Sequence, residues 1–109
     1  MAYDETLAQR IRAGLVPHGA FDEKKMFGGV GFLLHGNMVC GIHKNSLIVR
    51  VGPEKHTAAM AKPHVRPFDM TGRPMTGWIL VEPGGFDSDE DLSAWIELGV
   101  DYARGLPPK

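Results

Sequence analysis

Four side chains in the middle of the chain, His64, Arg66, Asp69 and Arg73, have the chemical types that acid–base work requires. A histidine and a carboxylate can transfer protons, and either arginine can form a charge-assisted pair with Asp69. Together they would make a small-molecule or enzymatic site, provided that a pocket shifts their pKa values. No recognised catalytic motif surrounds them, so this site is kept as an alternative.

Metal and covalent chemistry are not favoured. Cys40 and His43 would point to opposite faces of a strand, and no C-x-x-C or H-E-x-x-H motif occurs. Cys40 stands among Met38, Val39 and Ile42, which is typical of a small buried hydrophobe rather than a nucleophile. We therefore expect no metal, no cofactor, no catalytic residue and no enzymatic activity.

The glycine-rich run at residues 25–34 could instead bind a ligand. It is no P-loop, because Phe32-Leu33 follows its last glycine where Lys and Ser or Thr would be needed. It is closer to the RNP1 pattern of RNA-recognition motifs. Five residues fit that pattern: Lys25, Phe27, Gly28, Val30 and Phe32. Binding of RNA or single-stranded nucleic acid through this strand and the basic middle segment is a second alternative.

The favoured interpretation of the glycines is structural. Glycine weakens a strand unless something approaches its backbone closely. Gly29 and Gly31 repeat at the two-residue period of a strand, so we expect both to face one bulky side chain, from Trp78 or the last helix. The structural glycines are Gly28, Gly29, Gly31 and Gly77.

An exposed functional patch is predicted around Arg73-Pro74-Met75. Arginine and methionine are enriched at protein interfaces, and proline makes a loop rigid. The candidate interaction patch comprises Arg50, His64, Arg66, Asp69, Arg73, Pro74 and Met75.

Three helices are expected to support these residues. Asp4 can cap the first, which ends near Pro17. A second should start at Pro53 and stop before Pro63. Asp87 or Ser88 can cap the third, and Gly105 would end it.

The strands are expected to form an antiparallel meander with two later additions. The expected strands are 26–34, 38–42, 47–51, 64–70 and 75–81. Pro67 should place its strand at an edge. The predicted order is α-β-β-β-α-β-β-α, an α+β fold with a single mostly antiparallel sheet of about five strands and flanking helices.

The composition indicates one domain over residues 1–109, and a single cysteine excludes an internal disulfide. Six methionines and the lack of a signal-like N-terminus predict a reducing cytoplasm. No apolar stretch approaches the roughly 20 residues of a membrane span, so we expect no membrane contact. The net charge is −1, with a basic middle at 43–75 and an acidic segment at 82–101. This distribution opposes duplex-DNA binding by the chain itself.

Self-association, as a homodimer, is also expected. Three apolar strands would expose two faces and an edge, and modest helices would not cover all of this surface.

Several blocks of the chain, read in order, resemble the N-terminal domain of the TfoX/Sxy family. The blocks are Met26-Phe27-Gly28-Gly29-Val30-Gly31-Phe32, Val49-Arg50-Val51-Gly52, Pro63-His64, Phe68-Asp69 and Thr71-Gly72-Arg73-Pro74-Met75-Thr76-Gly77-Trp78. The resemblance covers about Leu7 to Ala103 and supplies no catalytic residues.

The resemblance implies a non-catalytic regulatory domain that acts by protein–protein contact. Well-known members of the family regulate natural competence and transcription and carry a second, C-terminal domain. We expect this chain to be a stand-alone first domain. Its implied partner is a protein, in the transcription machinery by family resemblance.

Overall fold

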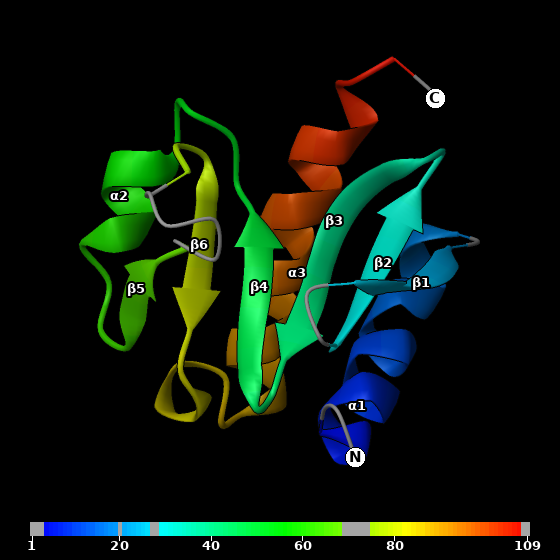
Figure 1. The fold of residues 1–109 in the computed structure, drawn as a ribbon, viewed down its shortest axis with the longest axis horizontal. Helices are drawn as coiled ribbons and strands as arrows, with labels where there is room; N and C mark the ends of the chain where they lie inside the picture. The colour runs from blue at the N-terminus through cyan, green and yellow to red at the C-terminus, as the bar shows by residue number, and fades with distance from the viewer. Residues whose placement is uncertain (1–3, 20, 27–28, 69–74, 108–109) are drawn as a thin grey trace.

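One antiparallel sheet organises the molecule (Figure 1). The computed structural model describes residues 4–19, 21–26, 29–68 and 75–107. Within these residues the sheet has six strands in the order β1-β2-β3-β4-β6-β5. The strands are β1 (Asp22–Met26), β2 (Gly29–Leu34), β3 (Asn37–His43), β4 (Ser46–Arg50), β5 (Val65–Pro67) and β6 (Trp78–Val81). The described helices are α1 (Glu5–Leu15), α2 (His56–Met60) and α3 (Asp89–Arg104), with short 3-10 turns at Val16–His18 and Pro83–Gly85.

The α+β class, the single sheet and the β2-β3-β4 meander are confirmed, but the strand count needs a correction. The strand predicted at 26–34 corresponds to β2, which begins at Gly29, and an unpredicted strand, β1, ends at Met26 and pairs antiparallel with it. The order is therefore α-β-β-β-β-α-β-β-α. The strand β1 was not predicted because it contains Glu23, Lys24 and Lys25, and charged residues have low strand propensity. Charged residues are nevertheless common on edge strands such as β1.

The helix ends follow the local signals in the sequence. The backbone N–H of Leu7 donates to Asp4 Oδ1 at 3.1 Å, and that of Asp91 donates to Ser88 Oγ at 3.1 Å. Gly105 follows the last residue of α3, as expected. The second helix is shorter than predicted, because residues 53–55 form a turn and no side chain caps α2.

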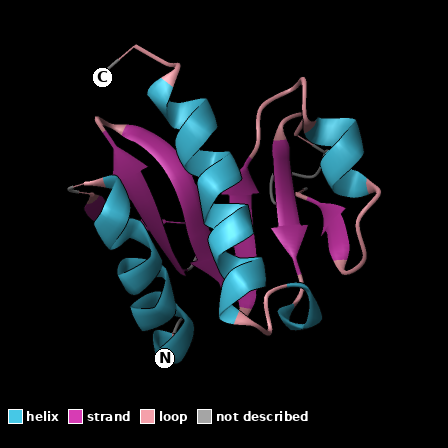
Figure 2. Ribbon diagram, turned by 180° about the vertical axis from the view of Figure 1, so that it is seen from behind, coloured by secondary structure: helices cyan, strands magenta, loops and turns pink. Residues whose placement is uncertain are grey.

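The main core lies between the sheet and two helices, α1 and α3, which cover the same face (Figure 2). Phe32, Ile42 and Val49 from the strands meet Ile11 and Ile96 from the helices, and all five are buried. None of the helices in the described ranges is long and apolar enough to cross a bilayer.

The opposite face of the sheet, called here the second face, carries a smaller apolar cluster. Its buried members are Met38, Ile48, Phe68 and Leu80. Trp78 and Met75 pack against them and remain half-buried. The rings of Phe68 and Trp78 stack with their centroids 5.8 Å apart.

The expectation that Gly29 faces a bulky side chain is wrong, and for Gly31 it stays a prediction. A Cβ on Gly29 would overlap the backbone carbonyl of Ile42 in β3, so the close neighbour is a strand and not a side chain. Gly31 pairs with Gly41 across the same two strands. Trp78 is in β6, beyond β4, and stacks on Phe68 instead. Gly28 lies outside the described residues.

Candidate functional site

The predicted interaction patch divides into two groups. Arg50 and Met75 lie on the second face beside Trp78. His64 and Arg66 lie at the β5 edge of the sheet. The remaining three, Asp69, Arg73 and Pro74, fall outside the described residues.

Arg50 is the chemically distinctive member of the first group. Its guanidinium lies over two rings, 5.1 Å from the centroid of Trp78 and 5.2 Å from that of Tyr102. All three side chains are half-buried. Within the described part of the chain, no oxygen accepts a hydrogen bond from Arg50 and no carboxylate pairs with it. The two rings attract the cation, and no described residue accepts a hydrogen bond from its N–H donors.

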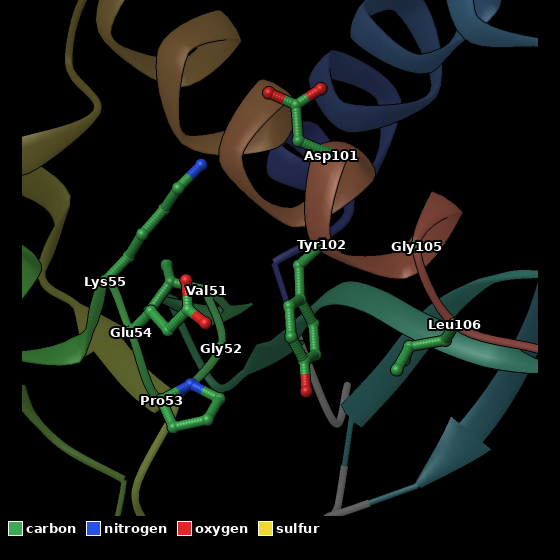
Figure 3. A pocket seen from close by; sticks show the side chains of 9 residues that line it. All are labelled: Val51, Gly52, Pro53, Glu54, Lys55, Asp101, Tyr102, Gly105 and Leu106. Atoms are coloured by element: carbon green, nitrogen blue, oxygen red, sulfur yellow. The ribbon is translucent and has the colours of Figure 1, made fainter.

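Tyr102 reaches this stack from the last turns of α3. Its ring lies against the backbone of Gly52, where an added Cβ would overlap it, and Gly52 has φ +87°. Figure 3 shows the ring between Pro53 on one side and Leu106 on the other. Glycine is therefore required at position 52 both for its backbone conformation and for the space that the ring occupies.

Trp78 is held by a second glycine, Gly77, which has φ +91°. The carbonyl of Gly77 accepts hydrogen bonds from the N–H groups of Val51 at 2.8 Å and Gly52 at 3.1 Å. Its own N–H donates to Nδ1 of His56 at 3.0 Å. These bonds fix the start of β6 against the end of β4, so Trp78 and Arg50 are placed side by side.

Sequence reasoning missed both Tyr102 and His56. Each acts through a partner far away in the chain, and neither belongs to a local motif. The available signal for Tyr102 was a large aromatic residue beside Ala103, at the end of the apolar stripe of α3. For His56 the sequence carried no signal.

A pocket of about 440 Å³ adjoins the stack and shares Tyr102 with it (Figure 3). Residues 51–55 form one wall, and Asp101, Tyr102, Gly105 and Leu106 form the other. The charged side chains Glu54, Lys55 and Asp101 are exposed. The side-chain amide Nδ2 of Asn37 donates to the carbonyl of Pro107 at 2.9 Å and so anchors the segment that follows α3.

The alternative site around His64 and Arg66 is not assembled in the described residues. The His64 ring lies against Gly84, where an added Cβ would be 2.7 Å from it. Arg66 Nε is 3.8 Å from Glu82 Oε1. The cavity that His64 lines is bounded by Trp95 of α3 and does not include Arg66.

The RNA alternative loses its stacking surface. Phe32 and Val30 of the RNP1-like pattern are buried in the main core under the helices. The second matched ring, Phe27, is outside the described residues. The basic middle segment is also dispersed, since Lys44 lies beyond the opposite end of β4 from Arg50, and Lys62 stacks on Trp95 of α3.

The described ranges contain no group of three or more His, Cys, Asp or Glu residues suited to hold a metal ion. Cys40 is buried, and burial raises the pKa of its thiol to about 12. The protonated thiol is a weak nucleophile and a poor metal ligand.

Comparisons with known proteins identify the family of the chain. No curated protein and no solved structure matches the chain. The family model of the TfoX N-terminal domain matches residues 13–103, a segment that contains Arg50, Trp78 and Tyr102. Because that segment is most of the 109 residues, the chain belongs to the TfoX N-terminal domain family.

Proposed function

We propose that this protein is a non-catalytic regulatory domain that binds a protein partner through its second face. The family is one of regulatory domains, which supports the regulatory part of the proposal. The observation that carries the contact surface is Arg50, stacked over two rings with donors that no described residue uses.

The residues around Arg50 have the composition of an interface hot spot. Arginine, tryptophan and tyrosine dominate the binding energy at protein interfaces, and methionine is enriched there. Arg50, Trp78 and Met75 are half-buried on one surface. The backbone bonds of Gly77 hold the strand ends in place, and the ring contacts of Trp78 with Phe68 and Arg50 reduce the side-chain freedom that binding would remove.

The proposed occupant is a protein segment that carries an acidic side chain next to an apolar one. The acidic group would meet Arg50 and the apolar group would meet Met75 and Trp78. Following the family, we place this partner in the transcription machinery and the complex in the cytoplasm.

The test is a quantitative co-purification from the native host with a photo-crosslinking residue at position 75. Arg50→Glu should abolish capture of the crosslinked partner. The matched control is Arg104→Glu, because Arg104 is an exposed arginine of α3 whose side chain bonds the carbonyl of His18. Capture should survive that change, and circular dichroism should show both variants folded.

Equal capture by wild type and Arg50→Glu would contradict the proposed surface. Recovery of RNA in place of protein, lost on ribonuclease treatment, would revive the nucleic-acid alternative.

A further inference from the structure

We propose that Arg50 is the receptor for a single carboxylate group. This inference deepens the proposed function and rests on it only for the source of that carboxylate, which is the partner protein. The site itself is defined by the guanidinium of Arg50, the rings of Trp78 and Tyr102 that orient it, and the half-buried Met75 beside them.

The planar geometry of the guanidinium group suits a carboxylate ligand. A guanidinium is planar, and its five N–H donors lie in that plane and point outward from the edge. The rings of Trp78 and Tyr102, whose centroids lie 5.1 and 5.2 Å from the guanidinium carbon, restrict its position without accepting a conventional hydrogen bond from it. An edge with parallel N–H donors matches the two oxygens of one carboxylate.

The hydration of Arg50 is the second feature that favours an anion. Arg50 is half-buried, so its guanidinium has lost part of its water. No described residue replaces that water with a hydrogen bond or an ion pair. A cation in this state gains more from an anion than a fully hydrated one would, because charge-assisted hydrogen bonds are stronger where water is excluded.

A third feature favours a carboxylate over a phosphate group. Phosphate sites gather several donors, often at a helix N-terminus or a glycine-rich loop. Arg50 is one fork, and the part of α3 that meets it is the C-terminal end. The pocket on which Tyr102 borders is lined by two acidic side chains, Glu54 and Asp101, against one basic side chain, Lys55, and this excess of negative charge would repel a dianion more than a monoanion.

The experiment observes the Nε–H resonances of arginine in the whole isotope-labelled chain. The Arg50 signal is assigned by its loss in Arg50→Lys. The probe is N-acetyl-L-leucine, a carboxylate with an apolar flank, and its neutral counterpart is N-acetyl-L-leucinamide. Inorganic phosphate is titrated separately, and ionic strength is held constant throughout.

N-acetyl-L-leucine should shift the Arg50 signal saturably, with half-saturation in the millimolar range expected for one small ligand. Arg66, an exposed arginine at the β5 edge, should not saturate. Tyr102→Phe keeps the ring and should keep binding, whereas Tyr102→Leu removes the ring and should weaken it several-fold.

Three outcomes would overturn the inference: equal shifts with the amide, linear shifts that Arg50 and Arg66 share, or tighter binding of phosphate than of the carboxylate. The proposed function fails separately. If Arg50 binds the carboxylate but no protein is crosslinked from position 75, the site stands and the partner proposal does not. If a partner is captured but the Arg50 signal does not respond to the carboxylate, the partner proposal stands and the carboxylate site does not.

Discussion

At the scale of single residues, Gly52 has the most exacting position in the candidate site. Its φ of +87° favours glycine, and the ring of Tyr102 fills the space of a side chain. Gly52→Ala should destabilise the fold by about 2–4 kcal/mol, from backbone strain and overpacking together. Urea unfolding of the variant measures this loss.

A double-mutant cycle separates the two causes. In a Tyr102→Ala background the alanine at position 52 meets no ring, so only backbone strain of about 1–2 kcal/mol should remain. If Gly52→Ala lowered the free energy of unfolding equally in both backgrounds, the ring of Tyr102 would not be a reason why position 52 requires glycine.

Cys40 gives a second prediction at the residue scale. Its fully buried thiol has a pKa of about 12, because burial disfavours the thiolate. The group is therefore protonated at pH 7 to 9, and a disulfide reagent should modify it only as fast as the protein opens. A rate close to that of the same thiol in the unfolded protein, measured in denaturant at the same pH, would contradict this placement.

At the scale of elements, an ion pair ties α1 to the edge strand β1. Arg12 Nε donates to Glu23 Oε2 at 2.7 Å, and Arg12 Nη2 donates to Oε1 at 2.9 Å. The hydrogen bonds from Arg12 lower the pKa of the Glu23 carboxyl below its ordinary value near 4.5. A lowered folded-state pKa adds stability above the ordinary value, and that stability is lost as pH falls through the lowered one.

Glu23→Gln should therefore lose stability at neutral pH and approach wild type in acid. The loss should be within about 0.2–1 kcal/mol, because both side chains are 38% exposed and water screens the pair. Chemical unfolding of both proteins between pH 7 and 3 tests this. A difference that stays constant, or grows as the pH falls, would remove the ion pair as its cause.

How far the sequence predicted these elements depended on the range of the signal. Asp4, Ser88 and Pro67 act within a few residues, so the two caps and the edge position of β5 could be predicted. The stack of Arg50 on Tyr102 joins residues far apart in the chain, and its existence follows only from how α3 crosses the sheet. Gly29 was predicted as a close-approach glycine, but alternation alone could not name β3 as its neighbour.

At the scale of the whole molecule, charge opposes binding to duplex DNA. The net charge is −1, and the first turn of α3 carries Asp89, Glu90 and Asp91. The described cations of the basic middle are divided among separate surfaces and form no single strip for a phosphate backbone. Fluorescence anisotropy with a labelled duplex should show no binding below about 10 μM at physiological salt.

Tight binding that weakens steeply as salt rises would show that the cations do act together. A polyanionic competitor that is not a nucleic acid, such as heparin, would then displace the DNA.

Self-association as a homodimer remains a prediction, but its physical grounds differ from the exposed apolar faces and open edge expected from the sequence. Both sheet edges are protected, β1 by Lys24 and Lys25 and β5 by Pro67. Among the described residues the exposed large hydrophobic side chain is Val16, at 73%, so no broad apolar face is open there. A homodimer would therefore have to use the half-buried second face around Met75, and we expect it to be weak.

Sedimentation velocity over the micromolar to millimolar range measures this association. The dimer fraction should rise with concentration and fall in Met75→Glu, because a charge placed in an apolar contact is costly. Val16→Glu is the matched control, since it adds the same charge at the exposed apolar residue after α1. Loss of the dimer in Val16→Glu alone would show that the interface lies at that end of α1. A monomer at every concentration would contradict self-association and leave the second face available to another protein.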